Sequence, residues 1–346
     1  MHSDHLLVAA ALSLLASLAA PVWLRPRLER LGVVDVASAR SSHVGTVVRG
    51  LGLSCVLAMA IATPAALYLS HRLESAGLGW ASLACGLACG ALGWQEDLRG
   101  VSIVGRMAVQ AGIGLVTCAI MLASVDISPW FLLAGAAAVP VLVNAVNFMD
   151  GVNGISGLYG LVAGGFFALQ GAEYAEPWLA IAGLTLAGAF VGFLPWNFGW
   201  FRWPASFMGD SGSYLLGGTL AALALGAFFV GVPIERVAAP FLIYLADTGY
   251  TLARRVITGA QVTLSHREHV YQRLTDVGFS HVGAAGTVIG FTVLTCVLGT
   301  LGASGQGNRL NVAAFATVAA IIIYLVLPEA VRALRGPSRP HREGVS

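Results

Sequence analysis

The sequence contains no lysine and few charged residues of any kind. Only 10% of its 346 residues are charged, whereas a soluble domain carries about 25%. Because 57% of the residues are hydrophobic, the chain cannot present a water-compatible surface, which excludes a soluble globular protein. The absence of lysine is best explained by a biased base composition of the gene. Arginine therefore supplies every permanent positive charge, and arginine binds phosphate in a bidentate manner.

Two other features are missing: a cysteine-based metal site and a signal peptide. All five cysteines lie in apolar stretches. Cys85 and Cys89 are one helical turn apart, but no neighbouring histidine or cysteine completes a metal site. We expect them to be small buried residues. The first apolar run lacks basic residues before it, which a secretory signal peptide would have.

Long apolar runs dominate what is present. A membrane core about 30 Å thick requires roughly 20 apolar residues per crossing. The candidate runs are Leu6–Trp23, Val47–Leu69, Leu78–Trp94, Arg106–Ala123, Trp130–Val146, Ile155–Gln170, Trp178–Leu194, Tyr214–Val230, Val237–Ala253, Val282–Leu301 and Val312–Leu327. They predict an all-α polytopic integral membrane protein with about ten or eleven transmembrane helices. Residues 1–334 would form a single bundle, followed by a basic tail at 335–346.

The arginines indicate how this bundle is oriented. With the N-terminus outside, only Arg72, Arg236 and Arg309 fall in outward loops, and all other arginines face inward. Basic residues are enriched on the cytoplasmic side of membrane proteins. An odd number of spans also places the basic tail inside. The sequence therefore predicts an outside N-terminus and an inside C-terminus.

The inward loops, at about 24–50, 94–106, 147–155, 195–213 and 254–281, contain nearly all residues suited to chemistry. A transporter requires polar groups near the bilayer midplane. Here the mid-span positions are mostly Leu, Ala, Val and Gly, and Asp247 with Thr248 is a modest exception. This distribution favours an enzyme whose substrate is partly cytosolic, with transport as the rival interpretation.

The first two loops combine phosphate-binding residues with paired acids. Ser42, His43, Thr46 and Arg49 suit a phosphate or pyrophosphate, although a plain basic interfacial loop would look similar. Glu96 and Asp97 end an apolar helix, where carboxylates are costly unless a cation or a substrate proton lies nearby. They could equally pair with Arg99 and Arg106.

The third and fourth loops supply oxygen ligands. Asn147, Asp150 and Asn153 lie on a glycine-rich turn and suit Mg²⁺, which one or two carboxylates and substrate phosphates usually hold. Asp210 directly precedes a span and follows Asn197 in the same loop region. It could hold a metal, or it could simply cap a helix N-terminus.

The fifth loop is basic and rich in histidine. His266 and His269 would share one helical face with Arg273, which is typical of a diphosphate clamp. A solvated basic face is the plain alternative. A zinc site is a weaker one, because a third ligand is lacking.

Together these loops resemble the polyprenyl-phosphate N-acetylhexosamine-1-phosphate transferase family, glycosyltransferase family 4, which includes phospho-N-acetylmuramoyl-pentapeptide translocase. The matching segments run in family order from about residue 35 to 281. They are Ser42-His43-x-Gly45-Thr46, Glu96-Asp97, Asn147-x-x-Asp150-Gly151-x-Asn153-Gly154, Asn197, Phe207-Met208-Gly209-Asp210-x-Gly212-Ser213 and His266-x-x-His269-x-Tyr271-Gln272-Arg273-Leu274. The last segment most resembles the branch that initiates O-antigen or exopolysaccharide units.

The sequence departs from the family pattern at two acidic positions and in the first loop. The family's adjacent aspartates appear as Glu96-Asp97, and its Asp-Gly-x-Asp-Gly loop has Asn153 at the second acid. Val47 and Val48 replace common prolines. These changes weaken the roles carried over to Glu96 and Asn153, while the three remaining aspartates match.

The resemblance implies that a UDP-sugar and polyprenyl phosphate give polyprenyl-diphospho-sugar and UMP, the first membrane step of cell-surface polysaccharide synthesis. It implies catalytic roles for Asp97, Asp150 and Asp210, with Mg²⁺ or Mn²⁺ at Asp150 and Asp210. Asp97 would act as base or steer the lipid phosphate. A covalent intermediate on Asp97 or Asp150 stays open. The implied substrate-binding residues are Ser42, His43, Thr46, Arg49, Glu96, Arg106, Asn147, Asn153, Asn197, His266, His269 and Arg273.

The resemblance also sets the expected surroundings. The partners are a UDP-N-acetylhexosamine-type sugar, undecaprenyl or decaprenyl phosphate and membrane lipid, with no nucleic acid, and a homodimer is plausible by family likeness. The site would face the cytoplasm from the bacterial inner membrane. Phe207-Met208-Gly209-Asp210 also prompts comparison with intramembrane aspartyl proteases. Those require a second aspartate facing the first within the bilayer, and Asp97 and Asp150 are predicted in loops.

Overall fold

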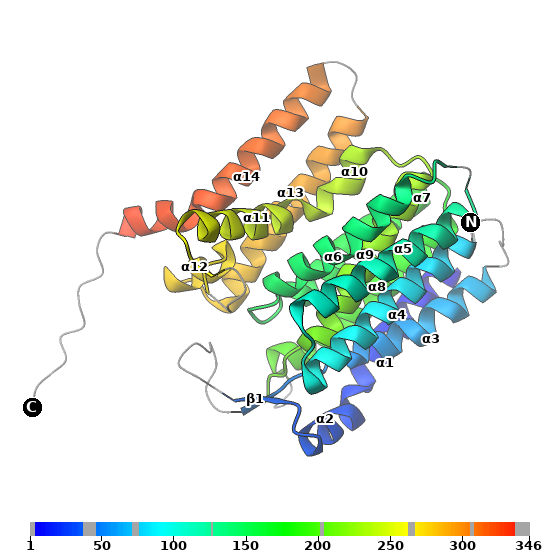
Figure 1. Ribbon diagram of the computed structural model, residues 1–346, viewed down its shortest axis with the longest axis horizontal. Helices are drawn as coiled ribbons and strands as arrows, with labels where there is room; N and C mark the ends of the chain where they lie inside the picture. The colour runs from blue at the N-terminus through cyan, green and yellow to red at the C-terminus, as the bar shows by residue number, and fades with distance from the viewer. Residues whose placement is uncertain are drawn as a thin grey trace, which may run out of the picture.

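The computed structural model describes residues 4–36, 46–70, 76–125, 127–200, 204–261, 267–304 and 308–335. These residues form a helical bundle with one short hairpin (Figure 1). The helices are α1 (Asp4–Ala19), α2 (Pro21–Arg30), α3 (Leu53–Leu69), α4 (Ala76–Arg99), α5 (Ile103–Leu122), α6 (Phe131–Met149), α7 (Ile155–Glu173), α8 (Pro177–Phe198), α9 (Gly209–Phe229), α10 (Ile234–Ala238), η1 (Ala239–Phe241), α11 (Leu242–Ile257), α12 (Val270–Asp276), α13 (His281–Ala303) and α14 (Asn308–Arg335). The strands are β1 (Val34–Val36) and β2 (Thr46–Val48).

Nine helical segments in the described ranges are long and apolar enough to cross a membrane, so the chain is a multi-pass membrane protein. They are Leu6–Arg30, α4, α5, α6, α7, α8, α9, α13 and α14. Each coincides with one predicted apolar run. The orientation of the termini remains a prediction.

The two other predicted runs form less regular structure. Val47–Leu69 begins with a strand, and its helical part, α3, has only 17 residues. Val237–Ala253 is divided among α10, η1 and α11. The division falls at Pro240, which lacks a backbone donor and whose ring obstructs a continuous α-helix. Nine of the ten or eleven predicted spans are therefore supported in the described ranges.

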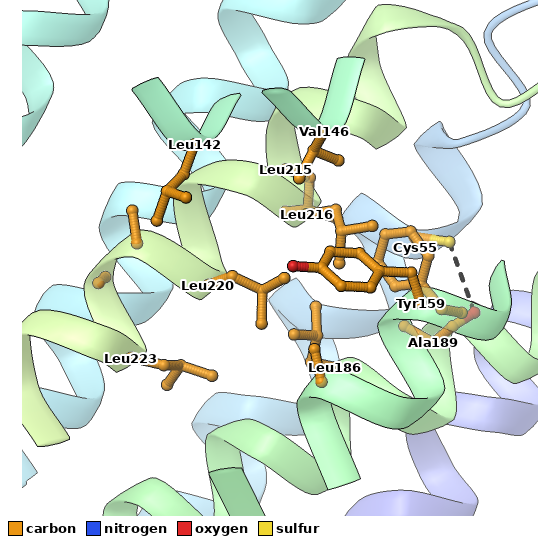
Figure 2. Close-up of a cluster of buried hydrophobic side chains, with 14 of the residues drawn as sticks. Cys55, Leu142, Val146, Tyr159, Leu186, Ala189, Leu215, Leu216, Leu220 and Leu223 are labelled. Atoms are coloured by element: carbon orange, nitrogen blue, oxygen red, sulfur yellow. Dashed lines mark hydrogen bonds between the residues drawn. The ribbon is translucent and has the colours of Figure 1, made fainter. Parts of the chain in front are cut away.

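The core is centred on α9, which is buried along nearly its whole length. Small residues on α4 allow close approach: a Cβ at Gly86 would lie 2.1 Å from Thr219 Oγ1 of α9. Glycine permits such backbone proximity in membrane bundles. Figure 2 shows part of this core, where leucines of α9 pack beside Tyr159 and Cys55 donates to the Ala189 carbonyl at 3.4 Å. All five cysteines are buried and free, as predicted.

A short hairpin near one end of the bundle accompanies the predicted helices. β1 pairs antiparallel with β2, with Val34 opposite Val48. Val48 then continues the pairing to a distant segment, because its carbonyl accepts from the Phe207 N–H at 2.8 Å. Gly52 N–H likewise donates to the Met208 carbonyl at 2.8 Å. The first loop is thus attached directly to the start of α9.

Candidate active site

The N-terminus of α9 is capped by a carboxylate from α4. Asp97 Oδ1 accepts from the Asp210 backbone N–H at 3.0 Å, and Oδ2 accepts from Ser211 N–H at 2.9 Å. Arg49 Nε also donates to Oδ1 at 3.0 Å. A carboxylate is favourable here because the first N–H groups of a helix have no partner within the helix. The Asp97 side chain is fully buried, whereas the Arg49 side chain is 39% exposed.

Two glycines allow this arrangement. A Cβ at Gly93 would lie 2.1 Å from the Asp210 carbonyl oxygen, so α4 touches the first turn of α9 through a bare backbone. Gly209 has φ of +73°, and a Cβ there would lie 2.8 Å from Asp97 Oδ2. Only glycine adopts this conformation readily and leaves room for the carboxylate.

Asp210 is joined to the end of α6 by an amide. Asn147 Nδ2 donates to Asp210 Oδ1 at 2.7 Å and to Ser213 Oγ at 3.0 Å. Within the described residues, Asp210 Oδ2 accepts no hydrogen bond. The structure therefore fixes the Asp210 side chain through one oxygen and leaves the other for a ligand.

Asp150 follows the last residue of α6, outside the apolar span. Ser156 donates to its Oδ1 at 2.6 Å. Burial raises the pKa of Asp150 from the ordinary 3.8 to about 7, opposed by the Ser156 hydrogen bond and reinforced by the charges of Asp210 and Asp97. Repulsion among these three carboxylates is the electrostatic condition that a bound cation relieves.

Glu96 and Arg106 form a neighbouring ion pair between α4 and the first turn of α5. Their closest atoms, Arg106 Nη1 and Glu96 Oε1, are 3.4 Å apart. Both side chains are largely buried, yet Glu96 Oε2 and Arg106 Nε have no hydrogen-bond partner among the residues that the structure describes. Buried polar groups are costly when unpaired, and such exceptions often occur at binding sites.

Asn197 connects two of the predicted loops. Its Oδ1 accepts from Gly154 N–H at 2.5 Å, and its Nδ2 donates to the Ser206 carbonyl at 2.9 Å. Both ends of the amide are therefore used to hold the backbone together. Asn153 lies in the linked turn and is partly exposed, and Thr46 is exposed on β2. Neither side chain hydrogen-bonds to another described residue.

The fifth loop docks on the third through α12. Tyr271 OH donates to the Phe148 carbonyl at 3.1 Å. A Cβ at Gly151 would lie 2.0 Å from the Tyr271 hydroxyl oxygen, so this glycine is required for the contact. The His269 and Phe148 ring centroids are 6.1 Å apart. The histidine segment thus lies beside the turn that carries Asp150.

His269 and Arg273 are each paired with an acid that the sequence reasoning did not assign to the site. His269 Nδ1 is 2.9 Å from Asp247 Oδ1 of α11. Arg273 pairs with Glu329 of α14. Asp247 was noted only as a hint of transport. A carboxylate within an apolar run is costly without a partner, and this signal could have identified it. Nothing local distinguished Glu329.

The structure therefore connects residues from all five predicted loops. The acid cluster consists of Asp97, Asp150, Asp210, Asn147 and Arg49, with the Glu96–Arg106 pair on the same α4 terminus. The histidine segment consists of His269, Tyr271 and Arg273 on α12. Ser42, His43 and His266 lie outside the described residues. No three His, Cys, Asp or Glu side chains within the described ranges form a ready-made metal cluster.

Comparison with known proteins identifies the relationship. Residues 80–227 match the family described as Glycosyl transferase family 4. The chain is 32% identical over 270 residues to a phospho-N-acetylmuramoyl-pentapeptide-transferase of Synechococcus, with 67% of this chain and 76% of the relative covered. The chain belongs to glycosyl transferase family 4. The matched region of this family 4 protein contains Asp97, Asp150 and Asp210.

Other members of family 4 align over most of their length. A decaprenyl-phosphate N-acetylglucosaminephosphotransferase of Mycolicibacterium smegmatis is 28% identical over 308 residues, covering 75% of this chain and 72% of the relative. A probable undecaprenyl-phosphate N-acetylglucosaminyl 1-phosphate transferase of Bacillus subtilis is 24% identical, with 80% of each chain covered. The family resemblance predicted from the loop motifs is confirmed.

Proposed function

We propose that this protein transfers an N-acetylhexosamine 1-phosphate from a UDP-sugar to polyprenyl phosphate, releasing UMP. The observation that carries the proposal is the convergence of Asp97, Asp150, Asp210 and Asn147 from three distant segments at one end of the bundle. The names of the relatives support the substrate class. The site would face the cytoplasm of a bacterial inner membrane.

The reaction balances without an added oxidant or reductant. A phosphate oxygen of the lipid attacks the phosphorus that bears the sugar, and the bond from that phosphorus to the UMP oxygen breaks. The second pKa of a phosphomonoester is about 6, so the nucleophile is mostly dianionic at neutral pH. The protein's task is then to position two anionic substrates and to offset the charge that develops.

Asp150 and Asp210 suit a hard divalent cation. Each has one carboxylate oxygen fixed by a described neighbour, Ser156 or Asn147, and the charges of the two acids repel each other. Mg²⁺ requires only one or two protein carboxylates when substrate phosphates and water complete its shell. Asp150 and Asp210 would hold Mg²⁺ or Mn²⁺, which when bound would offset charge on the phosphoryl oxygens.

Asp97 was predicted as the base or as the group that steers the lipid phosphate, and its contacts favour steering. Both of its oxygens accept hydrogen bonds from Arg49 and the first turn of α9. The half-exposed Arg49 is thereby aimed beside Asp210, where its guanidinium can bind a phosphate. For a covalent route, Asp150 is the less encumbered nucleophile.

The test uses purified protein, Mg²⁺, polyprenyl phosphate and a panel of UDP-sugars, with UMP release measured for each. Asp210→Asn should reduce turnover by more than about 100-fold, because it removes a negative charge that would hold the cation. The variant should still insert and purify as a folded protein. Near-normal transfer by Asp210→Asn, or no UMP from wild type with any UDP-sugar, would overturn the proposal.

A further inference from the structure

An interaction buried between α11, α12 and α14 supports a further role. Asp247 is fully buried on α11, within a run that is otherwise largely apolar. Taking an ionised carboxylate out of water is costly unless hydrogen bonds replace the lost hydration. The structure supplies those hydrogen bonds from three helices, and the central partner is His269.

The partners of Asp247 surround both carboxylate oxygens. Oδ1 accepts from the Val270 backbone N–H at 3.1 Å and lies 2.9 Å from His269 Nδ1. Thr251 Oγ1, one turn along α11, is 3.4 Å from the same oxygen. Oδ2 accepts from the Tyr324 hydroxyl of α14 at 2.6 Å. Val270 and Tyr324 both donate to Asp247, and an ionised carboxylate there would accept from the imidazole as well.

We propose that Asp247, with Tyr324 behind it, is a positioning residue that holds the His269 ring with its proton on Nδ1. This inference rests on the proposed function, together with the predicted role of His269 in binding the diphosphate of the UDP-sugar. A carboxylate that accepts from one ring nitrogen fixes the tautomer and orientation of the other. In this proposal Asp247 fixes the orientation of the ring through Nδ1, and Nε2 is the nitrogen that meets the substrate.

The surrounding packing restricts the ring to this orientation. The His269 side chain is only 3% exposed, and its ring stacks at 5.8 Å on Tyr271, whose hydroxyl is bound to the third loop. Phe148 covers it at 6.1 Å. Titratable groups near the imidazole in the described part of the chain include Asp247 from α11, Tyr324 from α14 and Tyr271 from α12 itself. Asp247 is the only acid in direct contact with the ring in the described part of the chain.

This arrangement also gives a role to polar residues in the C-terminal part of α14, a helix at the periphery of the fold. Tyr324 reaches Asp247, and Glu329 pairs with Arg273 one turn further along α12. Arg335 donates to the Val277 carbonyl just beyond α12. Figure 1 shows α12 beside α11, with the C-terminal part of α14 adjacent. The last helix thus supports the histidine segment.

The test is a double-mutant cycle on the full-length protein with Asp247→Asn and His269→Ala. Each single variant should weaken UDP-GlcNAc binding and lower kcat/KM on the order of 10- to 100-fold. If Asp247 acts through His269, the double variant should be no worse than His269→Ala alone. Multiplicative losses would overturn the proposal, because they would mean that Asp247 acts independently of the ring.

A second pair of variants separates positioning from general stability. Tyr324→Phe removes the hydroxyl that donates to Asp247, and we expect a loss of about fivefold in kcat/KM with an almost unchanged apparent Tm. Tyr159→Phe is the matched control, because Tyr159 OH is equally buried and donates to the Pro240 carbonyl at 3.1 Å. An equal loss in both variants would contradict the proposal. Asp247→Glu should restore part of the activity of Asp247→Asn.

Separate measurements of binding and turnover distinguish the positioning role of Asp247 from the proposed transferase function. Calorimetric titration with UDP-GlcNAc and Mg²⁺ measures binding and does not require transfer. The affinities of the four proteins of the double-mutant cycle can therefore be compared even if wild type releases no UMP. Absence of turnover with intact, non-additive binding would overturn the transferase function alone. Absence of binding by wild type to every UDP-sugar of the panel would overturn both.

Discussion

The two halves of the candidate site are held in different ways. The acid cluster lies at the ends of α4, α6 and α9, and 83% of the most apolar window of α9 is buried. The histidine segment lies on the seven-residue α12, which is supported by α14. Only 17% of the most apolar stretch of α14 is buried. Backbone packing positions the first half. Side-chain hydrogen bonds to Asp247 and Glu329 position the second.

This difference predicts that the acid half is more sensitive to added bulk than the histidine half. The largest effect is expected for Gly93→Ala. Alanine favours helix, but its Cβ would lie 2.1 Å from the Asp210 carbonyl oxygen, so α4 and α9 must separate. We expect transfer activity to fall more than about 100-fold, together with a lower apparent Tm. Gly112→Ala on α5 is the control, because a Cβ there has no neighbour within 4 Å. Equal behaviour of the two variants would show that this packing is unimportant.

The next largest effect is expected for Asp97→Asn. The amide can accept from only one of the two helix N–H groups and no longer attracts Arg49. Loss of such a cap costs about 1 kcal/mol of folding free energy. Activity should fall roughly 100-fold through misplacement of Arg49 and Asp210. Kinetics and thermal unfolding would be compared with those of Asp276→Asn, whose carboxylate is partly exposed at 3.7 Å from Arg267. A normal kcat in Asp97→Asn would refute the steering role.

A smaller effect is expected in the histidine half for Glu329→Gln. Arg273 would lose its anionic partner, while the Glu329 side chain is half-exposed and its loss is screened by solvent. The KM for the UDP-sugar should rise by up to about fivefold with kcat unchanged, in line with an ion pair worth up to about 1 kcal/mol. Arg332→Gln, an exposed change on the same helix, should leave KM unaltered. A lower kcat with unchanged KM would count against a binding role for Arg273.

The last prediction concerns pH and stability without divalent cations. The pKa of Asp150 is raised from 3.8 to about 7, so the folded protein retains a proton that the unfolded chain has lost between these values. This contribution favours the folded state at the acidic end, declines as pH rises through that window and is constant above it. In EDTA, the Tm of wild type should fall relative to that of Asp150→Asn as pH rises to about 7. Above that pH the difference between the two Tm values should stay constant. A pH-independent difference would contradict the assignment.

The sequence reasoning succeeded where the signal is local or repeated. Apolar runs predicted nine of the segments able to span the membrane, and motif order predicted the family. The grouping of the acid loops also followed from placing polar residues on one side. The break at Pro240 and the β1–β2 hairpin were missed. Both lie within stretches whose composition is typical of an apolar helix or a loop.

The contacts that individual site residues make were not evident from the sequence. Asn197 was predicted to bind substrate, yet both ends of its amide hold backbone groups of other loops. Asp247 was taken as a hint of transport, whereas its contact with His269 leads us to propose a positioning role. In both cases the partner is distant in sequence, so no local pattern could indicate the contact.

The sequence by itself determined that this chain lies in a membrane, which helices are apolar enough to cross it and which chemical groups it offers to phosphates. Those properties depend on composition and short spacing, because the bilayer selects for local hydrophobicity. Only the tertiary structure decided which donor each carboxylate receives. That choice depends on how closely α4, α9, α11 and α14 approach, and helix approach is set by packing between residues far apart in the chain.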